Sequence, residues 1–160
     1  MKQMRGNWPG VWAGKGNDGR TIRIEELAVT LRVTGEMTEQ AFAVVEFTAP
    51  PAHPGLGIHL HQHTIELIYV VAGTLAVTLG EATSLVRPGN SILVRPRNAH
   101  RLWNPSSTAV TYLTLLSPSG EERYYEQLAH LLANRPELTL AEATALAALD
   151  DNFDHILVHS

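Results

Sequence analysis

The chain has 160 residues, of which 44% are hydrophobic and 18% are charged, and its net charge is −4. This size and composition argue against disorder and predict one folded domain with a sizeable core. The negative charge gives no reason to expect nucleic acid or an anionic membrane surface as a partner. Because the chain has no cysteine, any bound metal must use nitrogen and oxygen donors.

No apolar run approaches the length of a membrane span, and the N-terminus lacks the apolar core of a signal peptide. We therefore expect a cytoplasmic protein. Residues 1–24 are predicted to form an irregular N-terminal arm, in which Trp8 and Trp12 are the large apolar anchors. The two tryptophans are expected to pack over a barrel end or a dimer surface, or to cap a ligand pocket.

Residues 25–117 are predicted to form a β-barrel. Apolar and polar residues alternate over 27–33, which is typical of a half-buried strand. A turn over 34–40 and a proline-containing loop over 49–57 interrupt the strand pattern. Further strands are predicted near 41–48, 59–61, 67–72, 75–79, 84–86, 92–94, 100–103 and 110–116. A series of short strands separated by turn signals indicates a sandwich or a barrel.

The hydrophobic period changes from strand to helix after the last predicted strand. Ser119 and Glu122 fit a capping box, and apolar residues then recur at helical spacing. Thr139 and Glu142 fit a second capping box in front of another apolar stripe. Residues 119–150 are therefore predicted to form a tail of two short helices. We expect these helices to pack on the barrel or on a partner and to be structural rather than catalytic.

Two histidines and a glutamate stand in a pattern that suits a metal ion. His59 and His61 are two residues apart, so in a strand their side chains project from the same face. Glu66 follows a polar turn and opens the next apolar strand, so a hairpin-like return would bring its carboxylate beside the imidazoles. Burying these groups unpaired would be costly, and a metal ion removes that cost.

A second stretch, residues 88–104, completes a resemblance to the cupin superfamily. The first cupin motif, His-x-His followed by Glu and Gly, falls on His59, His61, Glu66 and Gly73. The second motif falls on Gly89, His100 and Asn104, although Arg95 and Arg97 stand where the family has proline and glycine. These departures affect turn geometry rather than ligands. The resemblance extends over nearly the whole chain, to small bacterial cupins of the quercetin 2,3-dioxygenase-like type.

This resemblance implies an all-β fold, a double-stranded β-helix or jelly-roll barrel, with residues 1–160 as a single cupin domain. It implies a metal site made by His59, His61, Glu66 and His100. The metal would be one divalent transition ion, namely Fe, Mn, Ni, Co or Zn, because such N and O ligands suit all of them. The resemblance also implies a homodimer.

The expected function is that of a small-molecule oxygenase, which would use O₂ and an aromatic or enolic substrate. Glu66 would be either a catalytic proton shuttle or a fixed ligand. The alternatives are a metal-dependent isomerase or lyase, and a cupin that binds a small ligand without catalysis, because one fold hosts many functions.

Most of the other residues singled out near the motifs have more than one interpretation. His63 would contact or replace a metal ligand, or face solvent at the turn. Arg97 would steer an anionic substrate or be a solvated turn charge. Trp103 would belong to the barrel core or to the wall of a substrate pocket, and His53 is expected to be solvated. His130, His155 and His159 have no partner pattern and receive no predicted role.

Overall fold

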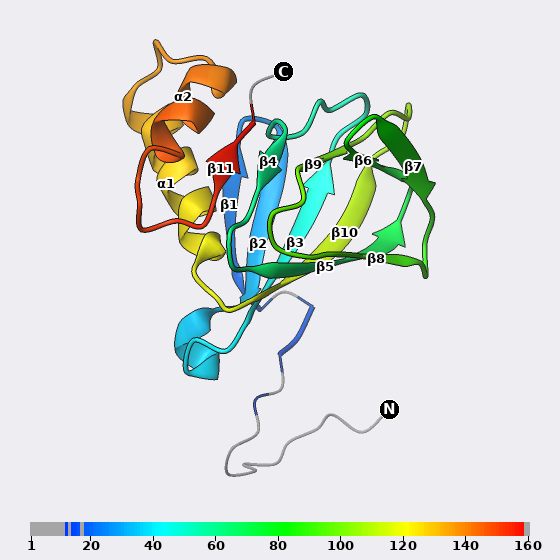
Figure 1. Cartoon of the computed structure of the whole chain (residues 1–160), viewed down its shortest axis with the longest axis horizontal. Helices are drawn as coiled ribbons and strands as arrows, with labels where there is room; N and C mark the ends of the chain where they lie inside the picture. Colours follow the sequence, from blue (N-terminus) through cyan, green and yellow to red (C-terminus); the bar gives the residue numbers. More distant parts are fainter. Residues whose placement is uncertain (1–11, 13, 17, 159–160) are drawn as a thin grey trace.

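The structure is a computed structural model that describes residues 12, 14–16 and 18–158. Two antiparallel sheets face each other across the core, with strand orders β1-β2-β3-β10-β5-β8 and β11-β4-β9-β6-β7 (Figure 1). The strands are β1 Arg20–Ile24, β2 Leu27–Val33, β3 Ala43–Ala49, β4 His59–Leu60, β5 Ile65–Ala72, β6 Leu75–Leu79, β7 Ala82–Val86, β8 Ser91–Val94, β9 His100–Trp103, β10 Val110–Ser117 and β11 Ile156–Leu157. This architecture is a double-stranded β-helix, which confirms the predicted fold class.

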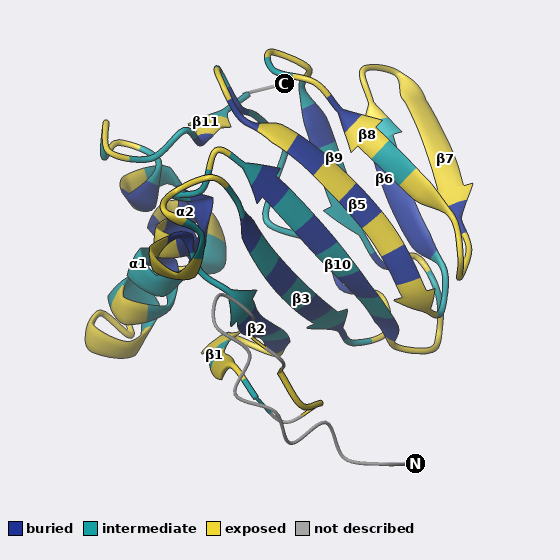
Figure 2. Cartoon of the chain, turned by 90° about the horizontal axis from the view of Figure 1, so that it is seen from below, coloured by how far each residue is buried: buried dark blue, intermediate teal, exposed yellow. Residues whose placement is uncertain are grey.

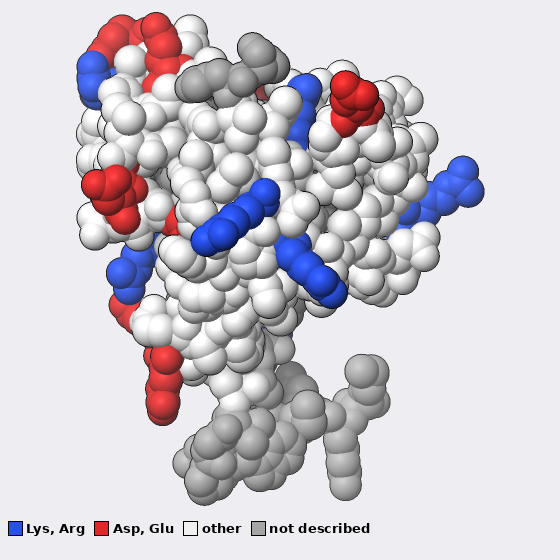
Figure 3. All heavy atoms as spheres, viewed as in Figure 1, with Lys and Arg blue, Asp and Glu red and all other residues white. Residues whose placement is uncertain are grey.

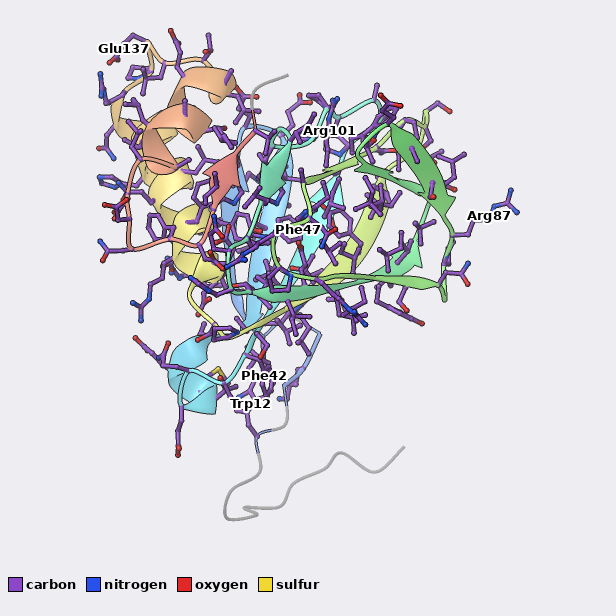
Figure 4. The ribbon with its side chains drawn as sticks, viewed as in Figure 1. Trp12, Phe42, Phe47, Arg87, Arg101 and Glu137 are labelled. Atoms are coloured by element: carbon purple, nitrogen blue, oxygen red, sulfur yellow. The ribbon has the colours of Figure 1, made fainter. Side chains whose placement is uncertain are left out.

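The barrel core is built from alternate residues of its strands. On β3 and β10 every second residue is buried, and on β5 buried Ile68 and Val70 alternate with exposed neighbours (Figure 2). Phe47 points into the barrel (Figure 4) and stacks on Tyr112 with ring centroids 5.0 Å apart. Full burial of such a side chain contributes about 1.5–3 kcal/mol, so this alternation fixes which face of each strand points inward.

Glycine is required at the turn between β5 and β6. Gly73 has a φ of 77°, and a Cβ atom there would lie 2.5 Å from the carbonyl oxygen of Ala109. A side chain at this position would be strained by the backbone conformation and would also collide with the backbone at Ala109. The glycine of the first motif therefore serves the turn that leads from the larger sheet to the smaller one.

Two helices cover one side of the barrel (Figure 1), as predicted for the tail. α1, Glu121–Asn134, buries Tyr124, Tyr125 and Leu128 against the core, and α2, Leu140–Ala147, packs on α1. The predicted capping box of α2 is confirmed. The Thr139 hydroxyl accepts the Glu142 N–H at 3.3 Å, and the Glu142 carboxylate accepts the Thr139 N–H at 2.8 Å.

The capping box predicted for α1 is wrong. The N-cap residue is Gly120, and the Ser119 hydroxyl donates to the Gln40 side chain at 2.9 Å. The Glu122 carboxylate instead accepts the N–H groups of Gly35 at 2.8 Å and Gly120 at 2.7 Å. Gly35 begins a 3-10 helix, Gly35–Thr38, so this glutamate links α1 to a turn that is distant in the sequence.

The predicted arm, residues 1–24, ends earlier than expected because β1 begins at Arg20 and pairs with β2. This strand has only two apolar residues, so hydrophobic periodicity does not reveal it. Trp8 lies outside the described residues. Trp12 is 56% exposed and lies beside β1 and β2 rather than near the motif histidines.

None of the helices in the described part of the chain is long and apolar enough to span a membrane. Lys and Arg side chains are spread over the face seen in Figure 3 without a large continuous patch.

Candidate metal centre

Three strands and one turn bring the four predicted ligands together inside the barrel. His59 on β4 lies opposite His100 on β9, and His61 follows immediately after β4. Glu66 projects inward from β5 in the opposite sheet. All four side chains are buried, and one donor atom from each lies within 4.8 Å of the others. The structure thus produces the convergence that strand alternation and the two motifs predicted.

Each of the three imidazoles is oriented by a backbone carbonyl. The Nδ1 atoms of His59, His61 and His100 lie 3.3, 2.6 and 3.0 Å from the carbonyl oxygens of Gly57, Asp154 and Asn98, in that order. A carbonyl oxygen can only accept, so each Nδ1 carries the donated proton. In the neutral rings the Nε2 lone pair is therefore free, as a metal ligand requires.

The free ring nitrogens face the carboxylate of Glu66. Its Oε2 lies 2.9 Å from Nε2 of His100 and 3.5 Å from Nε2 of His61. His61 Nε2 has no hydrogen-bond partner among the described residues. Acceptor atoms this close repel one another unless a cation or a proton lies between them. A divalent metal ion with nitrogen and oxygen ligands fits this donor set.

The pKa values of the clustered side chains also indicate that a positive charge among them is favourable. Burial and the neighbouring imidazoles hold the pKa of His59 well below its usual value. Burial opposes ionisation of Glu66, but the hydrogen bond with His100 and the nearby His61 imidazole outweigh it and lower the pKa of this carboxyl far below its usual range. Burial also opposes the charge on His61, but Glu66 and Glu121 raise its pKa to about 9. Without a metal, His61 therefore holds a proton beside the Glu66 carboxylate.

A small cavity adjoins His59 and Glu66 of the cluster. Its volume is about 20 Å³, enough for about one water molecule. Its wall is mainly apolar and aromatic, with Phe47, Leu75, Trp103, Tyr112 and Tyr125 among the lining residues. The site is thus enclosed in a low-dielectric pocket, where a charge on the metal or the substrate would act strongly.

A second, open groove of about 430 Å³ lies on the other side of a thin wall. Gly55, Leu56 and Gly57 line both spaces. A Cβ atom on Gly55 would lie 2.0 Å from the Leu102 carbonyl oxygen, so the wall packs directly on β9. Arg101 (Figure 4) also holds it, because its Nε donates to the Pro54 carbonyl at 2.8 Å.

Of the other residues predicted near the site, some line the cavity and some do not. Trp103 lines the cavity, and its indole N–H donates to the Thr78 hydroxyl at 3.2 Å. His63 and Arg97 are exposed, so their side chains do not line the cavity. The Arg97 backbone N–H donates to the His61 carbonyl at 2.6 Å, so this residue contributes through its main chain. His53, expected to be solvated, is 7% exposed and lines the cavity.

Three residues that the sequence did not reveal surround the cluster. They are Glu121 at the start of α1, and Asp154 and His155 in front of β11. His155 and Glu121 are buried, and a hydrogen bond of 2.5 Å joins His155 Nδ1 to Glu121 Oε1. Sequence spacing gives no signal for them, because they lie more than fifty residues after Glu66, the last ligand of the first motif. The available hint was the Asp-His pair in front of the short apolar run at residues 156–158.

The fold and the cluster define a class of protein, a jelly-roll barrel with a candidate His₃Glu metal centre at its inner face. The cupin domain family matches residues 45–116, which span β3 to β10 and include all four candidate ligands. The matched segment, residues 45–116, is a cupin domain. None of the curated proteins matches this sequence.

Solved structures share the fold at low sequence identity. KdgF from Halomonas sp. aligns with a TM-score of 0.60 at 15% identity, covering 68% of this chain and 96% of KdgF. The polyketide cyclase RemF from Streptomyces resistomycificus gives 0.58 at 18% identity, covering 68% of this chain and 80% of RemF. A cupin-superfamily sugar phosphate isomerase from Silicibacter pomeroyi gives 0.52 at 18% identity, and the match spans 59% of this chain and 60% of the isomerase.

Proposed function

We propose that this cupin is a metal-dependent enzyme that acts on a small molecule, with the metal held by His59, His61, Glu66 and His100. The observation that carries the proposal is the orientation of the three imidazoles. Each gives its Nδ1 proton to a main-chain carbonyl, and the Nε2 atoms of His100 and His61 lie 2.9 and 3.5 Å from Oε2 of Glu66. Such outer hydrogen bonds fix the tautomer and raise the basicity of a ligand.

A bound divalent metal would supply a Lewis acid that polarises an electronegative group of the substrate. The chain itself supplies the neutral nitrogen ligands, one anionic carboxylate and a pocket that excludes water. Four protein ligands leave positions open on a six-coordinate ion. Glu66 carries the only acidic side chain of the ligand set, and we keep it as the candidate proton acceptor as well as a ligand.

Redox-neutral chemistry, of the isomerase or lyase kind, is the reaction class that we favour. A sugar phosphate isomerase and a polyketide cyclase share this fold, so it supports such reactions on small molecules. The second candidate is a dioxygenase of the quercetin 2,3-dioxygenase type, which the resemblance to small bacterial cupins implies. That reaction would consume O₂ and act on an aromatic or enolic substrate.

Substrate entry requires the wall at residues 55–57 to move, because the inner cavity has room for about one water. The open groove outside this wall is lined mainly by apolar side chains of the loop, α2 and β11. We propose that a substrate approaches through this groove and displaces Leu56 to reach the metal. Lid movements of this kind are common in enzymes that exclude water from the reaction.

The reaction class is tested with protein loaded separately with Zn²⁺, Mn²⁺, Fe²⁺ and Ni²⁺. Each form is incubated with enolisable sugars and hydroxy acids without O₂, and with flavonols in an oxygen electrode. Turnover without O₂ uptake, lost in His100→Ala, is the expected result. O₂ uptake that depends on His100 would replace the isomerase or lyase proposal with the dioxygenase. Saturable binding without product in all forms would leave a ligand-binding cupin.

The homodimer implied by the resemblance has a suitable surface on the outer face of β5. Ile65, Leu67, Tyr69 and Val71 are between 36% and 47% exposed there (Figure 2). Leu93 on β8, 55% exposed, lies opposite Leu67 and extends the patch. These uncharged residues form a flat stripe, and a twofold axis would place it against a second copy of itself. We propose this face as the dimer interface.

A further inference from the structure

The segment after α2 returns to the barrel and reaches the metal centre from outside. Its strand β11 pairs with β4, so that Ile156 lies opposite Leu60 and Leu157 lies opposite His59 (Figure 1). The two residues in front of this strand, Asp154 and His155, are thereby brought against the candidate ligands. We call residues 150–158 the C-terminal strap.

Asp154 holds the turn that separates His61 from Glu66. Its carboxylate accepts three successive backbone N–H groups, those of Gln62 at 2.6 Å, His63 at 2.9 Å and Thr64 at 2.7 Å. Its own carbonyl accepts the Nδ1 proton of His61 at 2.6 Å. One residue of the strap therefore fixes both the turn and the ring of a ligand, with charge-assisted bonds to the turn.

His155 lies between two aromatic rings. Its imidazole is nearly parallel to that of His59, with centroids 4.2 Å apart, and to the phenol ring of Tyr124, with centroids 3.8 Å apart. The hydrogen bond between Nδ1 and Glu121 at 2.5 Å prevents rotation of the ring. One face of the His59 ring is thus supported by a side chain that is itself held by α1.

Glu121 and His155 are unfavourable residues for a barrel core that has only a structural role. Both are 2% exposed, and Glu121 Oε2 lies 3.9 Å from His61 Nδ1 without a hydrogen-bond partner among the described residues. Burying a carboxyl group and an imidazole costs roughly several kcal/mol. A pair of apolar side chains would not have this cost. A function at the neighbouring ligands accounts for their presence.

We propose that Asp154, His155 and Glu121 are positioning residues of the metal centre, so that the C-terminal strap and α1 hold His61 and His59 in the geometry that binds the metal. This inference rests on the proposed metal site. It adds that a segment outside the matched cupin domain, residues 45–116, is needed for tight metal binding.

An alternative use of the same groups is a second metal site, because His61, Glu121 and His155 also have donor atoms within 4.8 Å of one another. A hydrogen bond disfavours it. The Nδ1 atom of His61 already donates to the Asp154 carbonyl at 2.6 Å. The positioning role uses this bond as it stands, whereas a metal bound at His61 Nδ1 would displace it.

Cobalt binding distinguishes the possibilities. Co²⁺ affinity, stoichiometry and visible absorption are measured in the full chain, in His155→Phe and in Asp154→Ala. Phenylalanine retains a ring between His59 and Tyr124 but cannot bond Glu121. The matched controls are His130→Phe and Asp151→Ala, whose side chains are exposed. Circular dichroism and thermal unfolding without metal verify that each variant is folded.

We expect one Co²⁺ per chain in the unsubstituted protein, affinity weaker by about 10- to 100-fold in both strap variants with a changed absorption band, and no change in the controls. Affinity and spectra that match the unsubstituted protein would overturn the strap's role and leave the metal site intact. Two Co²⁺ per chain, with one lost in His155→Phe, would overturn it in favour of a second metal site. No Co²⁺ binding by the unsubstituted protein would overturn the metal site and the strap's role together.

Discussion

His59 and His100 lie directly opposite each other on the antiparallel strands β4 and β9, with ring centroids 4.3 Å apart. Because side chains alternate between the two faces of a sheet, this pairing directs both imidazoles into the barrel. A register shift of one residue would turn one of them outwards. The strand register, and not only the ligand motif, therefore creates the candidate metal centre.

Replacing Glu66 by Gln retains the size of the side chain and removes its charge. We expect affinity for Zn²⁺ or Mn²⁺ to fall by more than about tenfold, because loss even of a group that only orients a ligand costs about 10- to 100-fold. Calorimetric titration measures the change. Glu46→Gln is the control, since Glu46 pairs with Arg32 away from the cluster. Equal affinities in the two variants would show that Glu66 is not a ligand.

Phe47 links the barrel core to α1. It is 3% exposed, stacks on Tyr112 and meets the Tyr125 ring edge-on with centroids 5.1 Å apart. We expect Phe47→Ala to lower the free energy of unfolding by about 3–5 kcal/mol, because transfer and cavity terms add. Denaturant unfolding measures the loss, with Phe42→Ala, a half-buried site, as a milder control. A loss below about 1 kcal/mol would contradict this packing account.

His53 predicts a pH dependence of stability near the cavity. Burial lowers the pKa of His53, although Glu25 and Glu26 oppose the effect, and its Nδ1 accepts the Gly55 N–H at 3.1 Å. The unfolded chain then binds a proton more readily than the folded one, so this residue's contribution is complete above about pH 6.5 and declines as the pH falls towards its folded pKa.

Comparison with His53→Asn isolates this contribution, since Asn can accept the same N–H without titrating in this range. The difference in unfolding free energy between the two proteins should shift in favour of the variant as the pH is lowered from 7.5 to 5.5. A difference that stays constant over that range would contradict the buried, neutral state of His53.

The proposed dimer face predicts the effect of a charge on β5. We expect Leu67→Glu to convert a dimer to a monomer, because a carboxylate at the centre of an apolar interface must be desolvated. Light scattering coupled to gel filtration measures the mass. Leu149→Glu, at a site 76% exposed beyond α2, should leave the dimer intact. A monomeric unsubstituted protein would remove the dimer proposal.

Local patterns explain why so much of the barrel could be predicted. Alternation located β2 at residues 27–33, and the paired motifs located the four candidate ligands, because both signals depend on residues that are close in sequence. Thr139 and Glu142 likewise formed their predicted cap, in which every contact is local. Ser119 and Glu122 did not form their predicted cap. The Glu122 carboxylate instead accepts the N–H of Gly35, which lies 87 residues earlier in the chain.

The surroundings of the metal centre could not be predicted, because they depend on contacts between distant segments. Asp154 contacts a turn that is about ninety residues earlier in the chain, and the two-residue strand β11 that delivers it has no periodicity of its own. His155 received no predicted role for the same reason. Its partners, His59 and Glu121, become neighbours only when the tail folds over the barrel.

The most direct test of the central claim is the metal content of the purified, untagged protein, measured by plasma mass spectrometry beside His59→Ala, His100→Ala and the exposed control His130→Ala. The account predicts close to one divalent transition metal per chain in the unsubstituted protein and in the control, and its loss in the two ligand variants. An unsubstituted protein that holds no metal even after reconstitution, or ligand variants that retain it in full, would contradict the proposed metal centre.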